Sequence, residues 1–151
     1  MRDGRRAWLL LLPLMAACAT GAHHRARPPV AFDPRPFYSE RAIEVLHGTA
    51  SYYADSLAGN PTASGEAYDP RYFTAAHRKL PLGTILRVTR VDTGDWVLVR
   101  VNDRGPYAGR ERILDLSKVA AARLGILKIG VTRVQAEVLI LGPPRKSRSR
   151  R

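Results

Sequence analysis

The sequence predicts a mainly β protein built on one small β-barrel that carries a single short helix. Its 151 residues suit one domain with one modest core. Short β-branched segments separated by Gly, Pro and Asp turns dominate the second half, whereas one alanine-rich segment alone has the pattern of a helix. One short helix among many short strands is the pattern expected of a small barrel.

The N-terminus predicts an export signal. Three arginines among the first six residues precede an apolar run at residues 7–14, too short to span a bilayer, which takes about 20 residues. Small residues stand directly before Cys18, as in a bacterial lipobox. We therefore expect residues 1–17 to be a lipoprotein signal peptide and Cys18 to be the lipidated first residue of the mature chain. The alternative is an ordinary signal peptide with an incidental cysteine.

The signal is followed by a proline- and arginine-rich segment, which predicts a tether over residues 18–44. Its adjacent His23 and His24 lack a carboxylate or cysteine partner, so no metal site is expected there. For a cell with two membranes, the resemblance to a lipobox with Ala19 rather than Asp after the cysteine implies sorting to the outer membrane, facing the periplasm. Cys18 is the only cysteine, so no intrachain disulfide is possible.

The barrel is expected over residues 45–141. Residues 84–91 and 96–101 alternate apolar and polar side chains around a turn at residues 92–95, which predicts a hairpin. Further strands are expected at residues 112–116 and 131–141. Between them, Ser117 is the expected N-cap of a helix that runs from Lys118 to Leu124 and closes at Gly125.

The formal charge of +12 raises the possibility of nucleic-acid binding. The charge is uneven, however, because five basic residues fall in the last ten, residues 142–151, which predict a basic disordered tail. Export argues against a nucleic-acid partner, as does the lack of strands that interleave aromatic and basic residues. The tail suits anionic wall polymers or lipid.

Five polar segments interrupt the apolar strands and hold the residues suited to chemistry. They are GTASYY (48–53), PTASGE (61–66), FTAAHRKLPLGT (73–84), VNDRGPY (101–107) and RILDLS (112–117). Three of the barrel's acidic residues, Glu66, Asp103 and Asp115, stand beside glycine-rich turns or at strand ends, where functional groups gather. His77 is the one histidine in these segments.

These segments, in this order, resemble the rare lipoprotein A (RlpA) family over about residues 48–139. The resemblance implies a six-stranded double-psi β-barrel with one or two short helices. It implies an endolytic peptidoglycan lytic transglycosylase that prefers strands lacking stem peptides, with Glu66 and His77 at the family's matching functional positions. Tyr52 stands where the family usually has Trp. Many members also carry a C-terminal glycan-binding SPOR domain, which the short basic tail does not lead us to expect here.

Lytic transglycosylation needs a carboxyl group that protonates the leaving oxygen and then accepts a proton from the attacking 6-hydroxyl, leaving a 1,6-anhydro end. We expect Glu66 or Asp103 to be that group, with the other stabilising the oxocarbenium-like centre. His77 is expected to orient them by hydrogen bonding. Asp115 matches the acidic residue of expansin-like barrels and is a third candidate.

Substrate contacts are expected from the residues beside these acids: Tyr52, Tyr53, Arg104 and Tyr107. Structural alternatives stay open, since the tyrosines can pack in the barrel wall and Asp103 can brace a turn with Arg104. Likewise, Asp115 can support the start of the helix, and His77 can be a turn residue.

The expected partners are peptidoglycan glycan strands and, through Cys18, a membrane, for a monomeric protein. The proposed chemistry needs no cofactor, and the sequence has no metal-ligand spacing. The alternative function is a non-catalytic, expansin-like peptidoglycan-binding lipoprotein.

Overall fold

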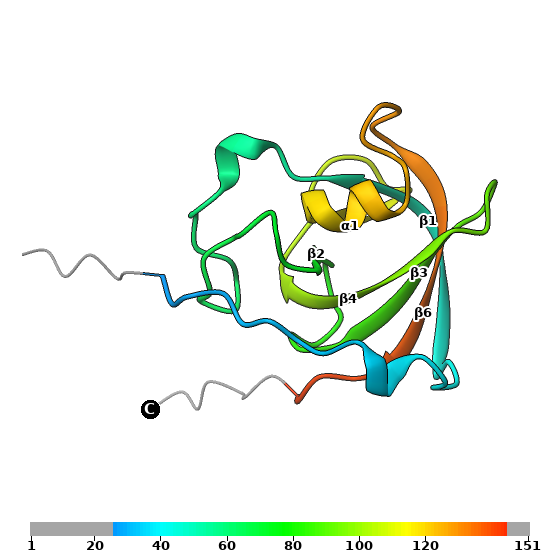
Figure 1. Ribbon diagram of the computed structural model, residues 1–151, viewed down its shortest axis with the longest axis horizontal. Helices are drawn as coiled ribbons and strands as arrows, with labels where there is room; N and C mark the ends of the chain where they lie inside the picture. The colour runs from blue at the N-terminus through cyan, green and yellow to red at the C-terminus, as the bar shows by residue number, and fades with distance from the viewer. Residues whose placement is uncertain (1–25, 145–151) are drawn as a thin grey trace, which may run out of the picture.

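The computed structural model describes residues 26–144, which form a closed six-stranded β-barrel with one short α-helix lying over it (Figure 1). No helix in this part of the chain is long and apolar enough to cross a membrane. The strands and helices are β1 (Glu44–Tyr52), β2 (Thr74–Ala76), β3 (Ile85–Arg90), β4 (Trp96–Asp103), β5 (Arg112–Leu116), α1 (Lys118–Arg123) and β6 (Thr132–Ile140), with 3-10 turns η1 (Arg35–Phe37) and η2 (Asp55–Leu57).

The strands close in the order β1-β5-β2-β4-β3-β6, so neighbours in the barrel are mostly distant in the sequence. Two pairs are parallel, β1 with β5 and β2 with β4, and the others are antiparallel. The two interleaved parallel pairs confirm the expected six-stranded double-psi barrel. They also bring the polar segments together, because those segments lie on or beside the paired strands.

The interior of the barrel is filled by branched apolar side chains. Val97, Val99 and Val101 of β4 alternate inward and join one continuous core with residues of β3, β5, β6 and α1. That alternation is the feature from which the sequence predicted the strand. The described residues contain no cysteine, so no disulfide contributes to the stability of this domain.

The hairpin, the β5 strand and the helix are confirmed, with ends that shift by one or two residues. Ser117 is the N-cap as expected, but its hydroxyl accepts the Thr74 N–H at 3.3 Å instead of capping the helix. Gly125 follows the last turn with a φ of +66°, a conformation that favours glycine. Two strands were not predicted individually: β1 is rich in small and polar residues, and β2 has three residues.

Residues 26–43, expected to be part of a flexible tether, lie along the outside of the barrel (blue to cyan in Figure 1) and are here called the strap. Phe32 and Phe37 of the strap pack on a second apolar cluster formed by β3, β4 and β6. Burial of these two rings outweighs the extended preference of the surrounding prolines. The predicted signal peptide, Cys18 and most of the basic tail lie outside the described residues.

Candidate active site

Two of the predicted acids lie in one row across neighbouring strands. Ser51 of β1 pairs with Asp115 of β5, Asp115 with Ala76 of β2, and Ala76 with Asp103 of β4. A register shift between Ala75 and Ala76 brings Ala76 opposite Asp103, two residues after Val101. Asp103 and Asp115 are therefore separated by one small residue, with Cα atoms roughly 10 Å apart from two strand spacings.

Asp103 closes β4 and is half-exposed, with its two carboxylate oxygens bound by different donors. The Tyr53 hydroxyl donates to one oxygen at 2.7 Å, and the backbone N–H groups of Ala63 and Arg104 donate to the other at 2.8 Å each. Burial, together with the bond to Asp103, raises the pKa of Tyr53, so this tyrosine stays a proton donor. The carboxylate is held in place by three donors before any ligand binds.

Asp115 is oriented by its neighbours in the barrel. The Ser51 hydroxyl donates to it at 2.7 Å, and Nε of Arg112 lies 3.2 Å from the same oxygen. Within the described chain, no hydrogen bond joins the Asp115 side chain to the first turn of α1. The alternative that Asp115 supports the start of this helix therefore has no direct contact behind it.

Glu66 lies apart from this row, in a buried ion pair. Its side chain is 8% exposed, and its two oxygens accept from the Arg100 guanidinium at 2.9 and 2.8 Å. Val30 of the strap donates its N–H at 3.4 Å. Burial alone would raise the pKa of Glu66, but the hydrogen bonds and charge of Arg100 outweigh it and the pKa lies below its ordinary value. A carboxylate held this way is suited to structure and poorly suited to donating a proton.

The lowered pKa of Glu66 predicts that the unfolding free energy depends on pH. Because its pKa is lower in the folded than in the unfolded chain, its stabilising contribution is complete above about pH 4.5 and is lost as the pH falls through the folded value. We expect the difference in unfolding free energy between the native chain and Glu66→Gln to narrow below about pH 4. Urea unfolding of both proteins at pH 7 and pH 3 measures this; a difference unchanged across that range contradicts it.

His77 is held by backbone groups. Its ring Nδ1 accepts the N–H groups of Lys79 at 3.1 Å and Leu80 at 3.0 Å, so in the neutral ring the proton sits on Nε2. The expected hydrogen bonds from this ring to the acids are not formed in the described structure. Its link to Asp103 is through the backbone, since the His77 N–H donates to the Asp103 carbonyl at 3.2 Å.

Burial, then the charges of Arg104, Arg78 and Lys79, lowers the pKa of His77 to about 4. We expect its ring to stay neutral above about pH 5, where an ordinary histidine titrates near 6.5. Since the unfolded chain takes up this proton first, stability falls as the pH drops from about 6.5 to about 4. A proton NMR titration of the ring checks this, and a midpoint near 6.5 contradicts it.

Of the other residues predicted to contact substrate, some pack in the barrel wall and some lie on the surface. The Tyr52 ring packs on the core and its hydroxyl donates to the Leu127 carbonyl at 2.7 Å, which matches the wall-packing alternative. Arg104 makes no ion pair with Asp103; its guanidinium donates to the carbonyls of His77 and Leu80. Tyr107 is 84% exposed and is free to meet a ligand.

The sequence prediction missed the residues that hold the acids in place. Ser51, Ala63 and Arg112 position the two aspartates, and Arg100 holds Glu66. The sequence did contain one signal for the partner of Glu66. Arg100 interrupts an apolar run in β4, and a buried cation there needs an anionic partner. Residues 26–144 contain no group of three or more His, Cys, Asp or Glu arranged to hold a metal ion.

The closed barrel with interleaved parallel strands and a row of carboxylates defines a double-psi β-barrel protein. Residues 45–136 match the family described as lytic transglycolase. The chain belongs to this lytic transglycolase family.

Two known proteins illustrate the similarity of the chain to others in sequence. A protein of Treponema pallidum named probable endolytic peptidoglycan transglycosylase RlpA is 49% identical over 105 residues, which is 70% of this chain and 33% of that protein. The endolytic peptidoglycan transglycosylase RlpA of Pseudomonas aeruginosa PAO1 is 47% identical over 102 residues, 68% of this chain and 29% of that protein. The matched part thus spans about a third of the length of these relatives.

Among solved structures, the Streptomyces papain inhibitor superposes with a TM-score of 0.53 at 22% identity, covering 67% of this chain and 99% of that one. At this identity the likeness bears on the fold alone.

Proposed function

We propose that the chain is an endolytic peptidoglycan lytic transglycosylase that cleaves the glycan strands of the cell wall. The observation that carries the proposal is the pair of oriented carboxylates, Asp103 and Asp115, in one row beside Ala76. Two carboxylates that flank a bound sugar are the groups that glycosidic bond cleavage uses. The names of the relatives support the same chemistry.

In the proposed reaction, Asp103 is the acid and then the base. A bound glycan strand displaces water from the partly buried carboxyl group and brings the glycosidic oxygen next to it. Asp103 gives this proton to the leaving glycosidic oxygen as the C1–O bond breaks. The 6-hydroxyl of the same muramic acid then attacks C1 and returns its proton to Asp103, so no water is consumed and a 1,6-anhydro end forms. Asp115, which accepts from the Ser51 hydroxyl and lies beside Arg112, stabilises the positive charge at C1.

Glu66 and His77 act in this scheme as positioning residues. Glu66 ends the tight loop at residues 62–66, and Arg100 anchors it there. The same loop supplies the Ala63 N–H that holds Asp103. His77 aligns the adjoining end of β2 with β4 through its backbone. In this proposal, Glu66 and His77 therefore affect catalysis by positioning Asp103.

The finer expectations belong to the same proposal. We propose a preference for strands that lack stem peptides and attachment to the outer membrane through a lipidated Cys18, on the basis of the lipobox-like sequence and the family resemblance. Labelled palmitate tests the anchor: incorporation that disappears in Cys18→Ser supports it, and no incorporation in the native chain contradicts it.

The experiment for the activity uses intact sacculi and sacculi stripped of stem peptides by an amidase. The purified chain is expected to release soluble glycan, and to do so faster from stripped sacculi. If the protein sediments with both substrates and releases nothing, the non-catalytic wall-binding alternative replaces the enzyme. Equal release from both contradicts only the stated preference.

A further inference from the structure

The barrel is closed, but its strand pairing has a gap along one side of β4, here called the opening. This strand has eight residues, whereas its neighbour β2 has three. Their pairing begins at Thr74 opposite Arg100, so within residues 26–144 no strand runs beside the first half of β4 on that side. A strand edge left open in this way presents unpaired backbone donors and acceptors.

The direction of those backbone groups follows from their neighbours. The Val101 N–H donates to the Thr84 carbonyl at 2.8 Å, toward β3, whereas the Arg100 N–H donates to Phe73 at 3.1 Å, on the β2 side. Successive residues of a strand direct their N–H and C=O groups to alternate sides. Trp96 and Leu98 therefore direct theirs to the same side as Arg100, into the opening.

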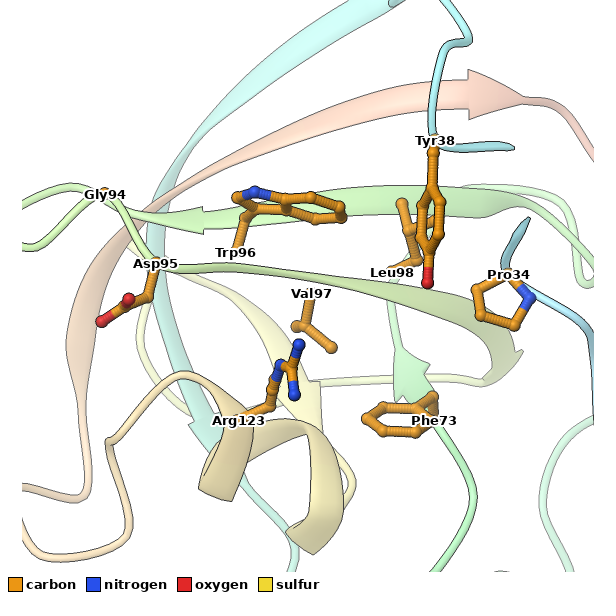
Figure 2. A pocket seen from close by; sticks show the side chains of 9 residues that line it. All are labelled: Pro34, Tyr38, Phe73, Gly94, Asp95, Trp96, Val97, Leu98 and Arg123. Atoms are coloured by element: carbon orange, nitrogen blue, oxygen red, sulfur yellow. The ribbon is translucent and has the colours of Figure 1, made fainter. Parts of the chain in front are cut away.

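This opening leads into a cavity of about 570 Å³, within the range of small-ligand sites (Figure 2). The cavity crosses the edge of β4, from the strap on one side to α1 on the other. Figure 2 shows Arg123 reaching from α1 toward Val97, while the rings of Trp96 and Tyr38 lie across the strand from it. Phe73 borders the lower side in the same view.

The lining combines fixed aromatic rings with unengaged charges. Trp96 is 44% exposed, meets Tyr38 edge to face at 5.8 Å and has the Arg87 guanidinium 5.7 Å from its ring centre, so its orientation is constrained. Arg123 and Asp95 line the cavity and form no ion pair within the described chain. Constrained rings beside a cation without an ion pair, and the backbone amide of the partly exposed Trp96, suit an amphipathic ligand that has an amide and an anionic group.

We propose that this cavity is a second glycan subsite, which binds an N-acetylated amino sugar with a free carboxylate, as in muramic acid without its stem peptide. The backbone groups of Trp96 pair with the acetamido group, the aromatic rings contact the sugar's apolar face, and Arg123 pairs with the carboxylate. The choice of ligand rests on the proposed function. Trp96 and Asp103 are about 23 Å apart along β4 at strand spacing, so this subsite holds sugars remote from the cleaved bond.

Tryptophan fluorescence tests the subsite directly. The chain has two tryptophans, Trp8 and Trp96, so the full chain with Trp8→Phe reports from the cavity alone. Titration with N-acetylmuramic acid is expected to give a saturable change in emission, with at least fivefold weaker binding of N-acetylglucosamine. Arg123→Gln is expected to remove that preference, whereas Arg133→Gln, also exposed but away from the cavity, leaves it unchanged.

No saturable change with either sugar overturns the proposal, as does an equal effect of Arg123→Gln and Arg133→Gln. Binding of a free stem peptide in place of the sugars also overturns it, because the open edge then serves as a peptide site. Product analysis of sacculi treated with the native chain tests the enzyme separately. Cleavage without sugar binding at Trp96 leaves the proposed function standing, and binding without cleavage leaves the subsite standing.

Discussion

Asp103→Asn is expected to lower glycan cleavage by at least about 100-fold, the contribution usual for a general acid–base group. An amide keeps the shape of the side chain: its oxygen can accept from the Ala63 and Arg104 N–H groups while its NH2 donates to the Tyr53 hydroxyl oxygen. It can neither give up a proton to the leaving oxygen nor receive one from the attacking hydroxyl. Asp103 is partly buried and forms no ion pair within the described chain, so its substitution should cost less stability than breaking the buried pair of Glu66 with Arg100. Glycan release and the melting temperature of the same preparation measure the two effects separately.

The matched control is Asp55→Asn, which removes an exposed carboxylate paired with Lys118 and should leave cleavage unchanged. Asp115→Asn should also slow cleavage, because the positive charge at C1 loses its partner. If Asp103→Asn keeps more than a tenth of the native rate while Asp115→Asn is inactive, the acid is Asp115 and the assignment to Asp103 is wrong.

Arg100→Gln is expected to lower the unfolding free energy by about 3–5 kcal/mol at pH 7, the usual cost of leaving one member of a buried ion pair without its partner. Arg100 and Glu66 are both largely buried, with side chains 13% and 8% exposed. The substitution also removes the bond from Arg100 to the Val30 carbonyl at 2.7 Å, which ties the strap to the barrel. Urea unfolding monitored by circular dichroism measures the loss.

The double variant Arg100→Gln with Glu66→Gln separates charge from packing. Since it leaves no buried charge, it should be more stable than Arg100→Gln alone. The penalty of Arg100→Gln should also shrink at low pH, where Glu66 becomes protonated. A loss below 1 kcal/mol, or a double variant no more stable than the single one, shows that the pair contributes little.

The elements predicted from the sequence are those with strong local signals. The β3–β4 hairpin has alternating β-branched residues, and α1 has alanines between a Ser N-cap and a Gly. β1 lacks such a signal because GTAS is small and polar, and β2 is defined by its neighbours alone. The strap has prolines that predict extension, but its docking depends on Phe32 and Phe37 finding an apolar cluster on distant strands.

The site residues could be predicted by type, but their partners could not. Ser51 and Asp115 are 64 positions apart, and Glu66 and Arg100 are 34 apart. These contacts exist because the barrel interleaves its parallel strands, which local pattern does not encode. The sequence thus offered Glu66 and Asp103 as equivalent candidates, and the ion pair with Arg100 is what distinguishes them.

The most direct measurement is the chemistry of the new glycan ends. Purified chain and the Asp103→Asn variant are incubated with glycan strands stripped of stem peptides, and the products are analysed by mass spectrometry. We expect internal cleavage that yields 1,6-anhydro-muramic acid ends with the native chain and almost none with the variant. Reducing muramic acid ends would show hydrolysis, and intact strands would show no cleavage; either result contradicts a lytic transglycosylase.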